Sequence, residues 1–239
     1  DEVERISKIA KSLIRIKKVK VISQFDVDGI SSASILMKAM LRENINFELR
    51  IVKQLTSDVI ESLDVDEDNF LIFSDCGSGQ LNLLKNILDR TQVLILDHHE
   101  PEKSNSLNLF HINPIVFGED EISSSMVCYL FAKFLNMKNT DLVDLAVIGA
   151  IGDMQDEGWE FKGLAKKILT EAETIGKISV TKGLRLYGRQ TRPLHRSLAY
   201  SFNPFIPGIS GSESNAVQFL SELGIAVKDR GEWKKLKDL

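Results

Sequence analysis

Five short apolar runs, separated by segments of helical periodicity, constrain the fold of this 239-residue chain more than any other feature. The runs lie over Val19–Ser23, Phe47–Val52, Phe70–Ser74, Val93–Leu96 and Leu107–Ile112. Apolar runs this short, alternating with helical patterns, are typical of parallel strands buried on both faces. The sequence therefore predicts an α/β fold with a doubly wound, mainly parallel five-stranded sheet that carries helices on both faces.

Apolar residues at helical spacing predict a helix before the first strand, helices between the strands, and a mainly helical region after about Glu121. The expected helices cover residues 3–16, 31–41, 57–63, 80–88, 124–135, 141–151, 164–175 and 214–223. The stretch Gly188–Ser214 predicts an ordered but irregular connector, after which Ser210 and Glu213 predict a capping box for the last of these helices.

The end of the chain predicts a truncated element. Arg230–Leu239 has the pattern of an amphipathic helix, with Trp233 and Leu236 on one face, but no capping signal follows it. We therefore expect a metal-binding core over residues 1–175, a basic connector and helical segment over 176–239, and a further domain missing from this chain.

Composition excludes several classes of protein. No run of about 18 apolar residues indicates a membrane span, and the charged N-terminal residues do not have the pattern of a signal peptide. The two cysteines, Cys76 and Cys128, form no CxxC pair. Their spacing argues against a disulfide framework or a zinc–thiolate site, so a cytoplasmic protein fits best.

Positive charge is concentrated in one segment of a chain whose formal net charge is −4. No acidic residue lies between Glu173 and Glu213, and that interval contains Lys177, Lys182, Arg185, Arg189, Arg192 and Arg196. Such a segment indicates either a site for an anionic ligand or a solvated basic face, and charge alone leaves both open. The interleaved aromatic residues leave the same choice between stacking on bases and packing of the connector: Tyr187, Tyr200, Phe202 and Phe205.

Four polar clusters follow apolar elements. They are Gln24-Phe25-Asp26-Val27-Asp28-Gly29, Asp75-Cys76-Gly77, Asp97-His98-His99 and, after the helical run AVIGAIG, Asp153. Any one of them has an ordinary structural explanation, since Asp and Gly are common in turns. Together they place carboxylates and imidazoles at the carboxyl edge of the predicted sheet, where ligands bind in open α/β folds.

A bound cation explains this grouping, because carboxylates held close together repel and raise one another's pKa. Carboxylates with imidazoles, and no thiolate, suit Mn²⁺ or Mg²⁺ better than structural zinc. Two such ions about 3.5–4 Å apart, bridged by one carboxylate, would clamp a phosphoryl group and generate a hydroxide nucleophile.

The order DxDG, D, DHH and GD resembles the DHH phosphoesterase superfamily, which includes the RecJ-type exonucleases and the family II pyrophosphatases. The segments GRQTRPL and NPFIPGISGSESNAVQFLSELGI are further similar to archaeal RecJ-like proteins of the replication machinery, relatives of a eukaryotic helicase-activating factor. The resemblance extends from Val19 to Ile225. It implies a hydrolase with two divalent metal ions, Mn²⁺ or Mg²⁺, that acts on single-stranded DNA or RNA. GINS-type replication proteins are the implied partners, and no membrane is involved.

The resemblance also implies a role for each motif residue. Asp26 would bind the first metal and Asp75 would bridge both, while Asp28, His98 and Asp153 would bind the second. The catalytic residues would be His99, Asp97 and Asp28. His99 would face the scissile phosphate and Asp97 would orient its neighbours. Candidates for binding substrate phosphates are His99, Ser31 and Ser32 at an expected helix start, and Arg189 and Arg192.

Two departures from the family pattern stand out. The family's usual histidine in the first motif is replaced by Gln24, whose amide oxygen is a weaker ligand for these ions, so the first metal should bind less tightly. In addition, nothing after Ile225 resembles the smaller DHH-associated domain of RecJ-like proteins. We expect retained activity, because every other motif residue is present.

Three functions are compatible with the sequence. The first is a metal-dependent exonuclease of single-stranded nucleic acid, in replication or repair. The second is a replisome adaptor in which the site is vestigial, which Gln24 favours. The third is a phosphoesterase of small nucleotides or pyrophosphate, against which the basic segment and the replication-type tail argue.

Overall fold

The computed structural model describes residues 2–119, 122–156, 160–181, 183 and 186–235. It consists of two compact units, Asp1–Ser179 and Val180–Leu239. Two residues named from the sequence, Lys182 and Arg185, lie outside the described residues, as does the end of the expected C-terminal helix.

The first unit contains the predicted five-stranded sheet, with strand order β2-β1-β3-β4-β5 and every neighbouring pair parallel. The strands are β1 (Lys18–Gln24), β2 (Phe47–Val52), β3 (Asn69–Ser74), β4 (Gln92–Leu96) and β5 (Leu109–Ile112). β2 lies next to β1 on one side, and β3, the next strand along the chain, lies next to β1 on the other side. The predicted fold class is thereby confirmed.

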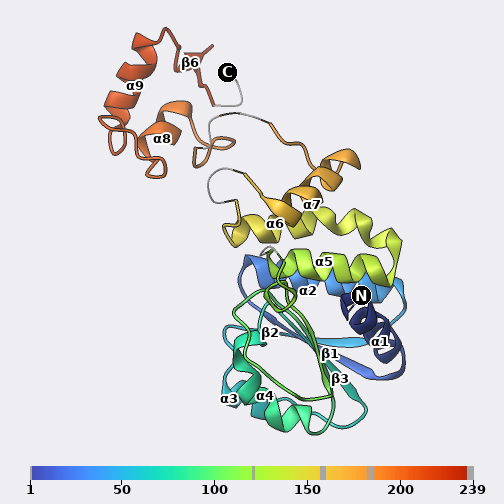
Figure 1. The fold of residues 1–239 in the computed structure, drawn as a ribbon. Coiled ribbons are helices and arrows are strands. Elements are labelled where there is room, and N and C mark those ends of the chain that lie inside the picture. Colours follow the sequence, from blue (N-terminus) through green and yellow to red (C-terminus); the bar gives the residue numbers. More distant parts are fainter. Residues whose placement is uncertain (1, 120–121, 157–159, 182, 184–185, 236–239) are drawn as a thin grey trace. The chain divides into compact units, whose positions relative to one another are not determined.

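Both faces of the sheet are buried beneath helices (Figure 1). Residues of β3 alternate between two cores: Phe70 and Ile72 pack with α1 (Glu2–Ile16), α2 (Val27–Arg42) and α5 (Ser124–Leu135). Leu71 and Phe73 point the other way and pack with α3 (Ser57–Glu61) and α4 (Leu81–Leu88). This burial on both sides explains why the strands read as unbroken apolar runs rather than alternating ones.

The helix that follows β1 begins earlier than its apolar pattern indicates. The sequence predicts it from Ser31, whereas α2 starts at Val27 because Asp26 is its N-cap and accepts a hydrogen bond from the Gly29 amide at 2.9 Å. A carboxylate at this position satisfies an amide that has no intrahelical partner. The capped turn brings the whole DxDG motif into the start of a helix.

A helical layer covers α2 and α5. The chain passes through the 3-10 helix η3 (Met137–Leu142) into α6 (Val143–Gly152), which packs on both α2 and α5, and α7 (Gly163–Thr174) packs on α6. Two further 3-10 helices, η1 (Ser78–Gln80) and η2 (Ile115–Phe117), follow β3 and β5. The residue after α6 is Asp153, which this packing carries toward the ends of the strands.

The second unit has a small core of its own. It contains α8 (Leu194–Ala199) within the stretch predicted to be irregular, because Leu194 and Leu198, four residues apart, both face that core. The predicted capping box of α9 (Glu213–Glu222) is wrong. Ser212 is the N-cap and accepts from the Asn215 amide, while the Ser210 hydroxyl is used in the preceding turn, where it accepts from the Ile206 amide.

The predicted helix from Arg230 onward is also wrong within the described residues. Lys228–Asp229 (β6) and Glu232–Trp233 (β7) form a two-stranded antiparallel ribbon. Arg230 and Gly231 both have positive φ, 49° and 92°, which is the conformation that a two-residue hairpin turn requires. The turn chemistry therefore overrides the amphipathic pattern. None of the described helices is both long and apolar enough to cross a membrane.

Candidate metal centre

The predicted ligands converge where the chain changes direction across the sheet, between β1 and β3. Asp28 lies in the first turn of α2 after β1, Asp75 follows β3, and Asp97 to His99 follow β4. Asp153 is the C-cap residue of α6 and arrives from the helical layer. Ligands of open α/β sheets bind at this kind of switch point, beyond the carboxyl ends of the strands.

Asp28 is held by the N-terminus of α5. Its two carboxylate oxygens accept hydrogen bonds from the backbone amides of Ser124 and Ser125 at 2.8 and 3.0 Å, and the residue is 3% exposed. Amides at a helix N-terminus interact favourably with a carboxylate, so this contact fixes the orientation of the Asp28 side chain.

Gly149 in α6 makes that arrangement possible. A Cβ atom at this position would lie 2.6 Å from Oδ1 of Asp28 and closer still to the Ser125 side chain. Only a glycine allows α6 to approach the Asp28 carboxylate and the start of α5 so closely. Gly149, the first glycine of the AVIGAIGD run, is therefore part of the candidate site, although the sequence interpretation assigned it no role.

Asp75 is the most perturbed carboxyl of the cluster. It is 2% exposed, and burial together with the charges of Asp28 and Asp26 raises its pKa to about 10. Its φ of 59° places it in the left-handed region, and its Oδ2 has no hydrogen-bond partner among the described residues. A buried carboxyl with an oxygen that lacks a hydrogen-bond partner and a strongly raised pKa has the properties of a metal ligand.

His98 joins the two sides of the cluster. Its Nε2 lies 3.6 Å from Oδ2 of Asp153 and 3.9 Å from Oδ1 of Asp75, and the residue is almost fully buried. Two groups of three ligands share it: Asp75, His98 and His99, and Asp28, His98 and Asp153. Within each group the ligand atoms lie within 4.8 Å of one another. The second group contains the same three residues that the resemblance implies for the second metal.

Asp97 orients the two histidines that follow it in the chain. It is fully buried, and its Oδ1 accepts from the His98 amide at 2.9 Å and contacts Nδ1 of His99 at 2.7 Å. Oδ2 accepts from the Ser78 amide at 2.9 Å. Burial opposes ionisation of this carboxyl, but hydrogen bonds and charge from His99 and hydrogen bonds from Ser78 prevail and lower its pKa.

His99 is the exposed member of the segment. Its hydrogen bond to Asp97 raises the pKa of the imidazole, against the opposing effect of burial, and half of its side-chain surface is exposed to solvent. Because Nδ1 faces Asp97, Nε2 is the ring atom left for contacts with a ligand. A protonated imidazole at this position is a hydrogen-bond donor suited to an anionic group.

A buried polar network that the sequence interpretation missed supports this segment. The Asn113 side chain is fully buried and donates through Nδ2 to the His99 carbonyl at 2.8 Å and to the Ser78 hydroxyl at 3.0 Å, while its Oδ1 accepts from the Ile115 amide at 2.9 Å. The Ser78 hydroxyl also contacts Nε2 of His111 at 2.8 Å. An asparagine directly after the fifth strand, in HINP, was the available signal.

Comparisons with known proteins agree with this geometry. The model of the DHH family, N-terminal domain, matches residues 18–150. The chain belongs to the DHH family. The DHH-CID domain model matches residues 186–239. DHH proteins are typically metal-dependent phosphoesterases, and this chain has a candidate metal site of its own.

An uncharacterized protein of Methanocaldococcus jannaschii, MJ0831, is 35% identical over 235 residues, which are 94% of this chain and 52% of the relative. The DHH chain thus spans about half the length of the curated relative it matches. Among solved structures, CDC45 from Entamoeba histolytica has a TM-score of 0.68 at 16% identity, over 98% of this chain and 53% of that one. RecJ from Thermus thermophilus in complex with Mn²⁺ has 0.57 at 17% identity, over 94% and 33%. These similarities concern the fold.

The DHH site does not gather every predicted residue. Asp26 is exposed, and it belongs to neither ligand group among the described residues; Gln24, at the end of β1, is half-buried. Ser31 and Ser32 were expected at a helix start, but they lie in the second turn of α2 and are buried. Their roles, and those of all the proposed ligands, stay predictions.

The remaining candidates lie elsewhere. Arg189 and Arg192 belong to the second unit. In the same unit, Nε2 of His195 lies 3.6 Å from Oε2 of Glu213, and the His195 ring packs against Trp233, so this histidine has structural contacts. Cys76 is buried in the core beneath α4, in keeping with a structural role.

The residues of this DHH chain fit a divalent cation. Asp75 provides a buried oxygen without a hydrogen-bond partner, and the two overlapping groups provide carboxylate and imidazole ligands with no thiolate. Oxygen and imidazole donors in this combination suit Mn²⁺ or Mg²⁺.

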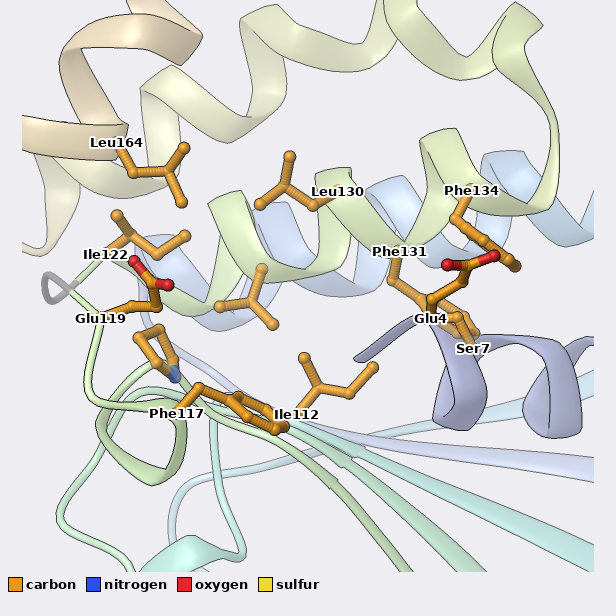
Figure 2. A pocket seen from close by; sticks show the side chains of 12 residues that line it. Glu4, Ser7, Ile112, Phe117, Glu119, Ile122, Leu130, Phe131, Phe134 and Leu164 are labelled. Atoms are coloured by element: carbon orange, nitrogen blue, oxygen red, sulfur yellow. The ribbon is translucent and has the colours of Figure 1, made fainter. Parts of the chain in front are cut away.

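Figure 2 shows a cavity in the first unit. Its volume is about 550 Å³. Its wall is mainly apolar and is formed by α1, β5, α5 and neighbouring segments: Glu4, Ser7, Ile112, Pro114, Phe117, Glu119, Ile122, Val127, Leu130, Phe131, Phe134 and Leu164. It includes none of the predicted site residues, so the apolar cavity and the metal centre are separate features.

Proposed function

We propose that this chain is a divalent-metal-dependent phosphodiesterase of the RecJ type that hydrolyses single-stranded nucleic acid. The observation that carries the proposal is the position of His98, whose Nε2 lies between the carboxylates of Asp75 and Asp153 within two overlapping ligand groups. A bound divalent ion would neutralise this cluster, polarise a phosphoryl oxygen and activate a water molecule.

The residues of the chain divide the work. Asp75, Asp28, His98 and Asp153 are the candidates to hold the cations, and the α5 amides hold the Asp28 carboxylate in a fixed orientation. His99, exposed and with a raised pKa, would donate through Nε2 to a phosphate oxygen or to the leaving oxygen. The Asp97 carboxylate contacts Nδ1 of His99 and thereby holds the His99 imidazole in one tautomer.

Single-stranded nucleic acid is the proposed substrate for two reasons. The sequence resembles RecJ-like proteins across both units, and the segment between Glu173 and Glu213 contains six cations and no acidic residue. Arg189 and Arg192 of that segment would contact backbone phosphates. The proposed setting is DNA replication or repair, with GINS-type proteins as partners.

The test is cleavage of end-labelled single-stranded DNA and RNA with Mn²⁺ and Mg²⁺ titrated separately. Asp75→Asn and His98→Ala should abolish cleavage, whereas Asp58→Asn, which alters an exposed carboxylate on α3, should retain most of it. Metal binding is measured in parallel by calorimetry, because it does not depend on the choice of substrate. Cleavage that persists in Asp75→Asn, or after removal of the metal by chelation, would rule the proposal out.

A second candidate function is a binding module of a replication complex with a weakened site. It is favoured by Gln24 in place of the family's usual histidine and by the absence of Asp26 from both ligand groups among the described residues. The fold similarity to CDC45 is compatible with it. This function predicts no turnover at any metal concentration in the wild type, and partner binding that Asp75→Asn leaves unchanged.

A further inference from the structure

In the second unit, an arginine is stacked on tyrosine rings. The guanidinium of Arg192 lies 4.5 Å from the ring centroid of Tyr187 and 5.7 Å from that of Tyr200. Both distances are within the range of cation–π contacts, which hold a guanidinium in place without neutralising it. The three residues are called here the Tyr–Arg cluster.

Gly188 lets the cluster form. The Arg192 amide donates to the Gly188 carbonyl at 2.7 Å, closing a tight turn, and Gly188 has a φ of 72°. A Cβ atom on Gly188 would lie 2.5 Å from Cδ and 2.7 Å from Cγ of Arg192. The glycine therefore provides both the left-handed turn and the space across which the Arg192 side chain reaches Tyr187.

Among the described residues, no carboxylate forms an ion pair with Arg192. Nε of Arg196, four residues further along, by contrast lies 3.3 Å from Oε2 of Glu213. Since the tyrosines fix the guanidinium without an anionic partner, its forked donors are left for a bidentate anion such as a phosphate.

The tyrosines are open to solvent. Tyr187 is 68% exposed and Tyr200 is 45% exposed, although both carry large planar rings. Tyr200 and Arg192 also line a groove of about 690 Å³ together with Thr191, Pro193, Arg196 and Glu213. A groove of this volume accommodates a ligand the size of a nucleotide.

The charge of the unit matches a polyanion. Residues 180–239 contain ten Lys and Arg against five Asp and Glu, while residues 1–179 contain twenty against twenty-nine. The formal charges are therefore +5 and −9, in agreement with the total of −4. A single strand of nucleic acid would be repelled by the acidic unit as a whole and attracted to the basic one.

We propose that the Tyr–Arg cluster binds one nucleotide of single-stranded nucleic acid, independently of the metal centre. A base stacks on the outer face of the Tyr187 ring, and the adjoining phosphate accepts two hydrogen bonds from Arg192. An acidic peptide would satisfy Arg192 but would leave the exposed ring unused, so a base with its phosphate is the better match. The biological role of this binding rests on the proposed function, because the cluster would hold the strand that the DHH site cleaves.

The experiment measures binding without cleavage. The full chain is titrated into a fluorescein-labelled oligothymidylate in excess EDTA and low salt, and anisotropy is followed. Tyr187→Ala and Arg192→Ala should each weaken binding about tenfold, in line with the usual contribution of one stacked base or one charged phosphate contact. Tyr187→Trp should bind as well as wild type, because the planar face is kept.

Lys228→Ala is the matched control. Lys228 also lies over an aromatic ring, with Nζ 4.2 Å from the centroid of Trp233. Replacing it with alanine removes one positive charge from the second unit, as Arg192→Ala does. This variant should bind within about twofold of wild type. Circular dichroism and thermal melts of each variant show whether the fold is kept.

Two results would overturn the proposal: wild type that does not bind the oligonucleotide in EDTA, or Tyr187→Ala that binds as wild type does. Failure of the proposed function looks different, because cleavage with Mn²⁺ or Mg²⁺ would then be absent while binding in EDTA still depended on Tyr187. Conversely, wild-type cleavage accompanied by Tyr187-independent binding would refute the Tyr–Arg cluster as a nucleotide site and leave the phosphodiesterase in place.

Discussion

Asp75→Asn should make the metal-free protein more stable, and increasingly so as the pH rises. Burial and the charges of Asp28 and Asp26 raise the pKa of Asp75 to about 10 in the folded chain, against 3.8 for an ordinary aspartate. Between these two values the folded protein keeps a proton that the unfolded chain has lost. Asparagine removes this linkage, has nearly the same shape, and tolerates the left-handed backbone at this position.

The magnitude follows from one proton. A carboxyl whose folded pKa is raised loses stability as pH rises from its unfolded pKa toward its folded pKa, at about 1.4 kcal/mol per pH unit. The interval from pH 6 to pH 8 lies wholly between the two values for Asp75, so this residue alone should cost about 2.7 kcal/mol across it. For a chain of this size that corresponds to a decrease in Tm of roughly 5–11 °C.

The assay is thermal unfolding in EDTA at pH 6, 7 and 8, for wild type and Asp75→Asn in the same buffers. Comparing the two slopes cancels the titrating groups that do not interact with Asp75. With Mn²⁺ present, wild type should regain stability more strongly at higher pH, because the cation replaces the proton and its apparent affinity should rise about tenfold per pH unit. Asp75→Asn should show almost no metal-induced shift.

Equal losses of Tm in wild type and Asp75→Asn between pH 6 and pH 8 would refute this reasoning. Asp75 would then be ionised in the metal-free protein, and the grouping of carboxylates would need another explanation than a missing cation. Calorimetric titration of Mn²⁺ in two buffers of different ionisation enthalpy provides the independent check, since wild type should release about one proton per ion bound at Asp75.

Three further predictions follow from the same site. Gly149→Ala should lower the free energy of unfolding by about 1–2 kcal/mol in urea titrations, since overpacking against Asp28 costs more than the ~1 kcal/mol that alanine gains as a helix former; an unchanged midpoint would mean that α6 moves away freely. Asn113→Ala should lower the free energy of unfolding by about 2–4 kcal/mol and reduce cleavage, because it leaves the His99 carbonyl without its donor; a variant as stable and as active as wild type would contradict the positioning role. Gln24→His should lower the Mn²⁺ concentration for half-maximal cleavage about tenfold, the effect of one better ligand worth ~1.4 kcal/mol; an unshifted titration would place Gln24 away from the metal.

The order of the elements and the place of the ligands were accessible from the sequence. Strands buried on both faces give unbroken apolar runs, as in Phe70–Ser74, and the connecting helices show their own periodicity. Because polar clusters directly follow such runs, their location at one edge of the sheet follows from the parallel topology alone. Local pattern and chain direction together therefore predicted the fold class and brought His98 near Asp75.

Elements stabilised by their surroundings were not accessible in this way. α8 lies in a segment rich in Gly, Pro, Ser and Arg. Its two leucines, Leu194 and Leu198, indicate a helix only once the small core that they face is known. The hairpin at Arg230 and Gly231 depends on two positive φ angles that compete with an amphipathic pattern of similar strength. In neither case does the local sequence pattern identify the conformation that the folded chain adopts.

The contacts that complete the site were decided by tertiary structure, because they join residues far apart in the chain. Asp28 meets the amides of Ser124 and Ser125, and Gly149 is needed only because three helices converge on that carboxylate. Asn113, directly after β5, reaches the His99 carbonyl in the segment that follows the neighbouring strand β4. A one-dimensional pattern records which residue types are present and how they are spaced, so the sequence alone determined the ligand chemistry and its sheet edge. Only folding determined which carboxylate lies against which amide, since a hydrogen bond depends on distance and direction in space.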